Sequence, residues 1–396
     1  MNFTTFDLHP RVAAGVTAQG FVTPTPIQAE AIPQVMKRRD VMGLAQTGTG
    51  KTAAFVLPML HRLIQGKQGR VRGLIIAPTR ELAEQIHETV QTLGRKTGIR
   101  SVTVYGGVSV HGQVVKLRQG ADIVVACPGR LLDLIGRGAV DLSRLEVLVL
   151  DEADHMFDMG FLPDIRRILG HVPRKRQTLL FSATMPREIR RLAEEVLNDP
   201  VTVQVDVSAP ATTVSHALYP VEPHLKTALL LELLRKTDTK SVLVFTRTKH
   251  RARRLGEQLA KAGYAAASLQ GNLSQTRRQS ALTGFRNGTY QILVATDIAA
   301  RGIDVTRVSH VINYDMPNTT DAYIHRIGRT GRVARTGDAF TLVCSEDREM
   351  VRAIERILHG RIDRRTVDDF DYGLRPARQK KAPARPPRRT ACRVGA

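Results

Sequence analysis

The stretch Val147-Leu148-Val149-Leu150-Asp151-Glu152-Ala153-Asp154 carries the strongest fold signal in this chain. Four consecutive branched apolar residues predict a strand that is buried on both faces, as in parallel sheets covered by helices. The carboxyl ends of such strands line the ligand crevice of an open α/β sheet. We therefore expect Asp151 and Glu152 to lie in a binding crevice. The alternative is an acidic helix start, which the helix dipole would also favour.

Short apolar segments alternate with helical segments on both sides of this stretch, which indicates βαβ units. The strands expected in the first half are 40–45, 73–77, 101–105, 122–126, 146–150, 178–182 and 201–205. Those expected in the second half are 241–245, 265–269, 291–295, 308–312 and 339–343. The sequence thus predicts an α/β fold with two domains, each a mostly parallel sheet with helices on both faces.

The domain boundaries follow from changes in composition. Residues 1–206 form the first expected domain, 207–213 a linker without periodicity, and 214–370 the second domain. Residues 371–396 are rich in Pro, Arg and Lys and hold too few apolar residues to offset chain entropy. We expect this last segment to be a disordered basic tail.

The chain has 396 residues, a formal net charge of +22 and a pI near 10.6, which point to a polyanionic partner. Its three cysteines, Cys127, Cys344 and Cys392, are far apart and lack metal-ligand spacing, which indicates a reducing compartment without structural zinc. Residues 1–20 lack a signal-peptide pattern, and no apolar run is long enough to cross a bilayer. We expect a cytoplasmic protein without a membrane partner.

A glycine-rich segment follows the first expected strand and precedes a helical segment. It reads Gln46-Thr47-Gly48-Thr49-Gly50-Lys51-Thr52. Glycines let backbone amides point at phosphate oxygens, Lys51 would reach the outer phosphates, and the Thr52 hydroxyl can ligate Mg²⁺. Asp151 then becomes a second magnesium ligand, and Glu152 is placed to orient or deprotonate the attacking water. Ala45 stands where the general pattern has Gly, but the strand-loop-helix context is kept.

These motifs, with the tetrapeptide Asp151 to Asp154, resemble the DEAD-box RNA helicases, and within that family most of all the bacterial RhlE type. The resemblance extends from Phe3 to about Leu358, with the motifs in the family's order. It implies that both domains are RecA-like and that the protein is an ATP-dependent RNA helicase using ATP and Mg²⁺.

Residues 20–28 resemble the family's adenine-reading motif, which includes Thr25. The Gln28 amide matches the N6/N7 edge of adenine and would select ATP. Phe21 or Phe3 would stack on the base. In the second domain, the resemblance places Gly302 and Asp304 at the ATP ribose.

The resemblance assigns RNA contacts to loops that follow expected strands, because donors and small backbone positions there suit phosphate contacts. The residues are Pro78, Thr79, Arg80, Gly107, Arg130 and Asp133 in the first domain and Thr246, Arg247, Gly271 and Thr296 in the second. Two positions depart from the family pattern. Cys127 replaces a usual Thr and is not expected to contact RNA, and Gln270 replaces a usual His.

Two further motifs would connect the sites. Ser182 and Thr184 resemble the coupling motif, whose hydroxyls would hydrogen-bond to Asp154 and pass the state of the nucleotide site toward the RNA. The segment from His325 to Arg332 is basic, and its other interpretation is a solvated charged face. By resemblance, Arg329 and Arg332 are arginine fingers that act once the domains close, and His325 contacts the acids across the cleft.

We expect the domains to close when ATP and RNA both bind, with local, non-processive and sequence-independent unwinding or remodelling of RNA duplexes or RNA-protein complexes. Ribosomal precursors and the RNA-decay machinery are candidate partners, and the oligomeric state is open. The alternatives are a DNA-directed relative, a non-catalytic RNA clamp and a phosphate-loop ATPase without nucleic acid. A clamp would be expected to lack Lys51, Glu152 or Arg329, and the last alternative leaves the basic charge unexplained.

Overall fold

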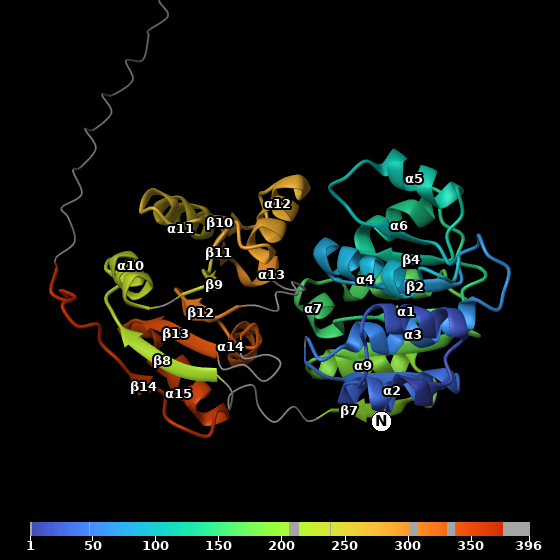
Figure 1. Cartoon of the computed structure of the whole chain (residues 1–396), viewed down its shortest axis with the longest axis horizontal. Coiled ribbons are helices and arrows are strands. Elements are labelled where there is room, and N and C mark those ends of the chain that lie inside the picture. Colours follow the sequence, from blue (N-terminus) through green and yellow to red (C-terminus); the bar gives the residue numbers. More distant parts are fainter. Residues whose placement is uncertain are drawn as a thin grey trace, which may run out of the picture.

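The computed structural model describes residues 2–46, 48–205, 214–237, 239–300, 308–330 and 337–374. They form two α/β domains that lie side by side (Figure 1). The expected linker 207–213 lies outside the described residues, and of the expected tail only 371–374 are described. The predicted fold class, two parallel sheets flanked by helices, is confirmed.

Domain 1 is built on a seven-stranded sheet in the order β3-β4-β2-β5-β6-β1-β7, in which every pairing is parallel. The stretch 147–150 is the central strand β5, which pairs with β2 on one side and β6 on the other. The strands are β1 Val41–Leu44, β2 Gly73–Ile76, β3 Ser101–Val104, β4 Ile123–Ala126, β5 Val147–Leu150, β6 Gln177–Ser182 and β7 Val201–Gln204. All seven were predicted.

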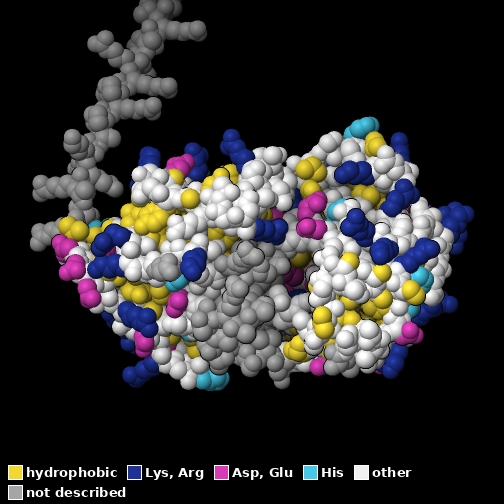
Figure 2. All heavy atoms as spheres, viewed as in Figure 1, with side chains coloured by type: hydrophobic (Ala, Val, Ile, Leu, Met, Phe, Trp, Pro, Cys, Tyr) yellow, Lys and Arg dark blue, Asp and Glu magenta, His cyan; other side chains and the backbone are white. Residues whose placement is uncertain are grey.

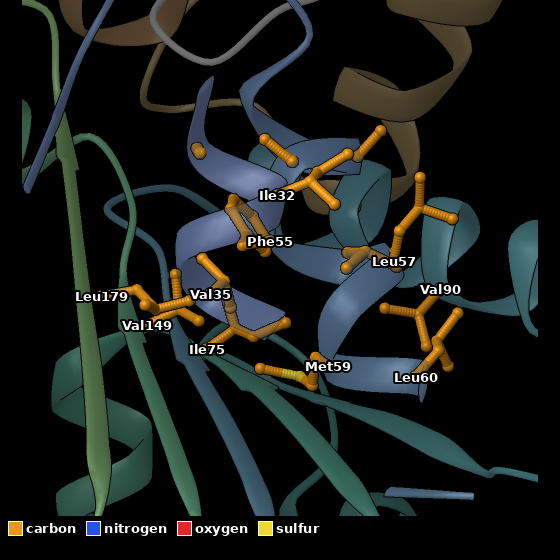
Figure 3. Packing of buried hydrophobic residues seen from close by; sticks show 14 of the residues in the cluster. Ile32, Val35, Phe55, Leu57, Met59, Leu60, Ile75, Val90, Val149 and Leu179 are labelled. Atoms are coloured by element: carbon orange, nitrogen blue, oxygen red, sulfur yellow. The ribbon is translucent and has the colours of Figure 1, made fainter. Parts of the chain in front are cut away.

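Helices cover both faces of this sheet because successive strand residues point to opposite sides. Val149 packs in one apolar cluster with residues such as Phe55, and Leu148 packs in the other with residues such as Leu180. Figure 3 shows the first cluster, with Ile32 and Phe55 above the sheet. The helices are α1 Pro10–Ala18, α2 Pro26–Met36, α3 Lys51–Leu63, α4 Arg80–Leu93, α5 Val110–Arg118, α6 Pro128–Gly136, α7 Ala153–Asp158, α8 Leu162–Leu169 and α9 Arg187–Val196.

Domain 2 contains a second seven-stranded parallel sheet in the order β10-β11-β9-β12-β13-β8-β14. Its strands are β8 Val214–Pro220, β9 Val242–Phe245, β10 Ala266–Leu269, β11 Ile292–Ala295, β12 His310–Asn313, β13 Gly337–Val343 and β14 Asp363–Arg364. Its helices are α10 Lys226–Lys236, α11 Lys249–Lys261, α12 Gln275–Arg286, α13 Asp297–Ala300, α14 Thr320–Ile327 and α15 Arg348–Ile357. The two sheets have the same order, so β1 corresponds to β8 and α3 to α10.

Two strands of domain 2 were not predicted. β8 pairs with β13 over its whole length, but Ser215 and His216 interrupt its apolar pattern. β14 has two exposed polar residues, which pair with Ala217 and Leu218 at the sheet edge. The expected strand 308–312 also begins later, at His310. The polar residues in β8 and β14 interrupt the apolar periodicity on which strand prediction depends.

None of the helices in the described part of the chain combines the length and the apolar character that a bilayer crossing needs.

Candidate active site

The glycine-rich segment forms the turn between β1 and α3. Gly48 and Gly50 have φ angles of 88° and 93°, a left-handed conformation that glycine adopts without strain. Thr49 Oγ1 donates a hydrogen bond to the backbone oxygen of Gln46 at 2.7 Å. Thr47 lies outside the described residues. The loop therefore has the backbone shape that a phosphate cradle requires.

Lys51 is the first residue of α3, and it is buried beneath the loop. Its Nζ donates to the backbone oxygen of Ala45 at 2.5 Å. Asp151 follows β5 and is 2% exposed. Burial raises the pKa of Asp151, and the nearby charge of Lys51 opposes this shift. A cation bound beside Asp151 would likewise stabilise the ionised form of this buried carboxyl group.

Asp151 and Thr52 fit the needs of Mg²⁺, which prefers oxygen ligands and keeps several waters while bridging substrate phosphates. No cluster of three or more His, Cys, Asp or Glu side chains that could hold a metal occurs among the described residues. The donor set therefore suits a metal that arrives with a nucleotide, not a cage built by the protein alone.

Glu152 has a left-handed backbone, with φ 54° and ψ 54°, and is the N-cap of α7. Its carboxylate lies 2.8 Å from Nδ1 of His155, and both side chains are buried. Burial raises the pKa of Glu152, but the charge and hydrogen bond of His155, with Lys51 and Arg329, outweigh it and lower the pKa. Sequence reasoning missed His155, although its i,i+3 spacing from Glu152 at a helix start was a usable signal.

The coupling residues meet at Asp154. Its Oδ2 accepts hydrogen bonds from Thr184 Oγ1 at 3.0 Å, from Thr184 N at 2.9 Å and from Ala183 N at 3.2 Å. The Ser182 hydroxyl accepts from the backbone N–H of Asp154 at 3.2 Å and donates to the backbone oxygen of Thr184 at 2.8 Å. Thr184 thus contacts the carboxylate and Ser182 the backbone of the same residue.

The N-terminal motif lies against the phosphate loop. Gln28 Nε2 donates to the backbone oxygen of Gly50 at 3.1 Å, and Gln28 Oε1 accepts from Thr25 N at 3.0 Å. The Gln28 amide keeps one N–H and one lone pair beyond these bonds. The rings of Phe3 and Phe21 lie 5.8 Å apart, with Phe3 buried and Phe21 39% exposed. Phe21 therefore presents the accessible aromatic face.

Domain 2 reaches the acids of domain 1 through α14 and the residues after it. The ring of His325 packs edge to face against His155, with centroids 5.4 Å apart. Burial raises the pKa of Asp154, but charges that include His325 outweigh it and lower the pKa. Arg329 is 5% exposed, and its charge helps to lower the pKa of Glu152. Arg332, Gly302 and Asp304 lie outside the described residues.

Arg326 has a structural role that sequence reasoning did not assign. Its guanidinium forms a two-bond ion pair with Asp297, at 2.5 and 2.8 Å, and donates to Asn313 Oδ1 and the backbone oxygen of Asp315. It also lies over the ring of Phe245, 5.0 Å from the centroid. Arg326 therefore holds α14 on the sheet and orients His325 and Arg329 beside it.

The expected RNA-contacting residues of domain 1 gather at the carboxyl edge of the sheet. Arg80 lies so close to Gly107 that a Cβ there would be 2.1 Å from Nη1. Thr79 caps α4 by accepting from Leu82 N at 3.3 Å, and Pro78 beside it is buried. Asp133 pairs with Arg130 at 3.6 Å and with Arg137 at 2.7 Å.

Cys127 departs from the family pattern at the N-cap of α6, where it makes no side-chain capping bond. Burial raises the pKa of its thiol to about 12. Its replacement of Thr therefore removes a capping oxygen without adding a reactive thiolate.

In domain 2, Arg247 and Gly271 are exposed, and Thr296 is half-buried. Thr246 is fully buried and donates to the backbone oxygen of Thr248 at 3.4 Å, so it lies beneath the surface that Arg247 forms. Gln270, the second departure from the family, is buried and accepts from Asn272 N at 2.7 Å.

A polar contact joins the two domains near the first RNA loop. Arg278 of α12 forms an ion pair with Glu81 of α4 at 2.7 Å, with side chains 11% and 4% exposed. Gln275 also lies 3.4 Å from both Arg80 and Glu81. Figure 2 shows acidic side chains in the cleft between the domains and basic side chains spread over both.

Comparison with known proteins places this arrangement in a family. Residues 25–192 match the DEAD/DEAH box helicase model, and residues 225–334 match the helicase conserved C-terminal domain. The chain is 42% identical over 374 residues to the DEAD-box ATP-dependent RNA helicase CshA of Geobacillus kaustophilus, covering 94% of this chain and 80% of that protein.

Two solved structures of a yeast protein compare well. Dbp5 of S. cerevisiae bound to RNA and ADP BeF3 is 32% identical, with a TM-score of 0.85 over 93% of this chain and 96% of that one. A Dbp5 variant bound to Nup159, a Gle1 variant, IP6 and ADP is 31% identical, with a TM-score of 0.65 over 91% and 96%. Because the identities are nearly equal, the difference in score reflects geometry.

The phosphate loop, the acids that face it and the arginine-bearing helix across the cleft thus occur together with a relative that matches almost the whole chain. This chain belongs to the DEAD-box ATP-dependent RNA helicases, a family of enzymes that hydrolyse ATP and act on RNA.

Proposed function

We propose that this protein couples ATP binding and hydrolysis to closure of its two domains on RNA, and that closure drives local, non-processive and sequence-independent unwinding. The observation that carries the proposal is the approach of α14, and of the residues just after it, to the acidic segment at the start of α7. His325 meets His155 there, and the charge of Arg329 acts on Glu152. A hydrolytic site assembled from two domains works only when they are together.

Hydrolysis would use groups from both domains. Lys51 would leave the Ala45 oxygen for the outer phosphates, and Glu152 would accept a proton from the attacking water. Arg329, and Arg332 beyond the described residues, would stabilise the charge that develops on the transferring phosphoryl. Asp151 and Thr52 would hold Mg²⁺, which supplies charge neutralisation when bound.

His155 would keep Glu152 in place for this step. Glu152 has a left-handed backbone and its carboxylate is held at Nδ1 of His155, so the side chain has little freedom. The ring of His325 packs edge to face against the same His155 ring. Closure would therefore position the base through His155.

Adenine recognition would use the free N–H and lone pair of Gln28, with Phe21 stacking on the base and Thr25 holding the turn. Gly302 and Asp304 would complete the site at the ribose. Because Gln28 is bonded to Gly50, base recognition and the phosphate loop would respond to each other.

RNA would bind across the loops of both domains, and the ten residues assigned from the sequence remain proposals. Arg80, Arg247 and the amides near Gly107 and Gly271 can contact phosphates, which carry no sequence information. Through its 3.0 Å hydrogen bond to Asp154, Thr184 would couple changes at the nucleotide site to the RNA-binding loops.

Closure is supported by the comparison with Dbp5, since the RNA-bound form superposes better than the form with ADP and protein partners. Ligands that favour one closed state must raise each other's affinity by the same factor. Ribosomal precursors and the RNA-decay machinery stay as candidate partners. The RhlE type and the cytoplasmic location also remain predictions.

The test measures ATP turnover with single-stranded RNA, with DNA of the same sequence and without nucleic acid. We expect stimulation by RNA well above that by DNA, because RNA recognition uses the 2′-OH. Equal stimulation would favour a DNA-directed relative. Strand separation should fall steeply between a short and a long duplex, and equal rates for the two would contradict local unwinding.

A further inference from the structure

The two domains can be compared strand by strand, because their sheets have the same order. β1 pairs with β6 and β7 as β8 pairs with β13 and β14. The loop after β8 therefore occupies the place of the phosphate loop, and Lys226 begins α10 as Lys51 begins α3. Open α/β sheets bind ligands at this edge, outside the carboxyl ends of the strands.

The loop after β8 cannot cradle a phosphate as its counterpart does. Residues 221–225 contain no glycine, and Pro223 among them lacks the backbone N–H. Lys226 Nζ is already hydrogen-bonded inside domain 2. It donates to the backbone oxygens of Tyr314 at 3.0 Å and Leu342 at 3.2 Å. A ligand at this edge must therefore be held by side chains.

A cavity of about 520 Å³ lies at this edge. Its walls come from β8, the end of β13, α15 and β14. The corresponding elements of domain 1, β1, the end of β6, α9 and β7, line a second cavity of about 520 Å³. Both domains thus have a cavity at this place in the fold. The side chains that line the cavity of domain 2 differ from those in domain 1. Its volume is typical of ligand pockets.

The cavity of domain 2 combines guanidinium groups with apolar walls. Arg348, Arg352 and Arg364 line it, whereas Arg190 is the one arginine among the described residues that line its counterpart. No carboxylate in the described part of the chain forms an ion pair or hydrogen bond with these three arginines. Val351 and Tyr372 supply apolar wall. Glu222 is the acidic residue of the lining, so positive charge is in excess.

The cavity lies at the β8 end of the carboxyl edge of the sheet, whereas the expected RNA contacts Thr246, Gly271 and Thr296 follow β9, β10 and β11 at the other end of that edge. In Figure 1 the arrow of β8 points to the side of domain 2 that is remote from domain 1, and α10 and β14 lie on that side. An occupant there would not compete with ATP in the cleft. The chain's own segment 375–396 holds eight basic residues and no acidic ones, so it does not suit an arginine-lined cavity.

We propose that this cavity docks an acidic peptide segment of a partner protein. Carboxylates would pair with Arg348, Arg352 and Arg364 in the two-bond geometry that guanidinium favours, and an apolar side chain would pack between Val351 and Tyr372. Arginine and tyrosine are also the residues that most often dominate binding at protein interfaces.

The test selects peptides from a random dodecapeptide display library on the full-length protein, with Arg348→Glu/Arg352→Glu as the counter-selection target. Selected peptides are synthesised with a fluorescent label and titrated by anisotropy. Arg361→Glu is the matched control, because Arg361 is exposed in the same domain and does not line the cavity. If the double charge reversal lowers the midpoint of thermal unfolding, the neutral variant Arg352→Gln replaces it in the titrations.

We expect enriched peptides that carry acids around one aromatic or branched apolar residue. Their affinity should fall about tenfold or more in the double variant or in Arg352→Gln, and less than about twofold in Arg361→Glu. RNA-stimulated ATP turnover should be unchanged in all three. Equal weakening by Arg361→Glu, or no acidic enrichment, would overturn the proposal. Displacement by inorganic phosphate or by a short RNA would also overturn it, in favour of an anion subsite or an RNA contact.

Discussion

Lys51 and Lys226 begin corresponding helices in two domains with the same strand order, yet their surroundings differ. Lys51 lies under a loop whose glycines leave room for phosphates, and it donates to one backbone oxygen. Lys226 lies behind a proline-containing loop and donates to two. The same fold thus places Lys51 at the proposed nucleotide site of domain 1 and gives Lys226 a structural role in domain 2. The groups that domain 2 is proposed to contribute to hydrolysis lie at the end of α14 and just after it.

Arg329→Lys is the variant with the largest expected effect, and it tests whether domain 2 supplies a group for ATP hydrolysis. A lysine keeps the charge but not the planar fork, so we expect hydrolysis to slow by about 10³-fold with nucleotide affinity nearly intact. Single-turnover hydrolysis and binding of a fluorescent ATP analogue separate the two effects. Arg361→Lys is the control, and unchanged turnover in Arg329→Lys would remove this residue from the proposed machinery.

The two lysines provide the next test. Lys51→Ala should lower RNA-stimulated turnover by about 10²-fold or more, because a charge that meets the developing negative charge is lost. Lys226→Met should change turnover by less than about twofold while shifting the thermal midpoint, since its bonds lie inside domain 2. A large loss of ATP affinity in folded Lys226→Met would contradict the comparison.

His155→Ala tests the positioning of Glu152 within domain 1, next to the ring contact with His325 of domain 2. We expect kcat to fall roughly tenfold at saturating RNA, with KM for ATP unchanged, because the base loses its orientation but the phosphate loop does not. His155→Asn places an amide nitrogen near the position of Nδ1 and should recover part of the rate. Failure of Asn to do better than Ala would show that the effect is not the hydrogen bond to Glu152.

The ion pair between Glu81 and Arg278 tests contact between the domains on the RNA side. Glu81→Gln should weaken RNA binding with a non-hydrolysable ATP analogue by about fivefold, because a buried charge on Arg278 loses its partner only when the domains meet. RNA binding without nucleotide should change less. Reversal of both charges, Glu81→Arg with Arg278→Glu, should recover affinity, and no recovery would argue against a direct pair.

The smallest effect is expected at Cys127. Cys127→Ser restores a hydroxyl of similar size at the N-cap of α6 and should stabilise domain 1 by about 0.5–1 kcal/mol. Thermal unfolding measures the change, and ATP turnover should stay within about twofold. A loss of stability would show that the buried site does not tolerate the hydroxyl.

Much of the fold was visible in the sequence because it depends on local apolar runs. Val147 to Leu150 and Ile123 to Ala126 stand out as continuous apolar segments between turn signals, and the outer strands 101–104 and 201–204 as alternating ones. β8 and β14 did not, because Ser215, His216 and the pair 363–364 pair as strands only through contact with neighbours already in the sheet. Strands with so few apolar residues depend on tertiary context.

The candidate active site also contains residues that the sequence predicted and residues whose roles needed the structure. Phosphate-loop chemistry is contiguous in the chain, so Gly48, Gly50 and Lys51 could be assigned by spacing. Within the basic segment, the resemblance named Arg329 and Arg332 as arginine fingers, but only the structure gave Arg326 a role. Arg326 points to Asp297 inside domain 2, whereas the charge of Arg329 acts on Glu152 in domain 1.

The sequence by itself determined the two parallel sheets, the phosphate loop and the acids at the end of β5, because each depends on residues close together in the chain. The tertiary structure alone decided that His155 links Glu152 to His325 and that Lys226 is an internal counterpart of Lys51. It also placed three arginines around one cavity of domain 2. These relations join segments far apart in sequence, and only the packing of helices on the sheets, and of one domain on the other, sets their distances.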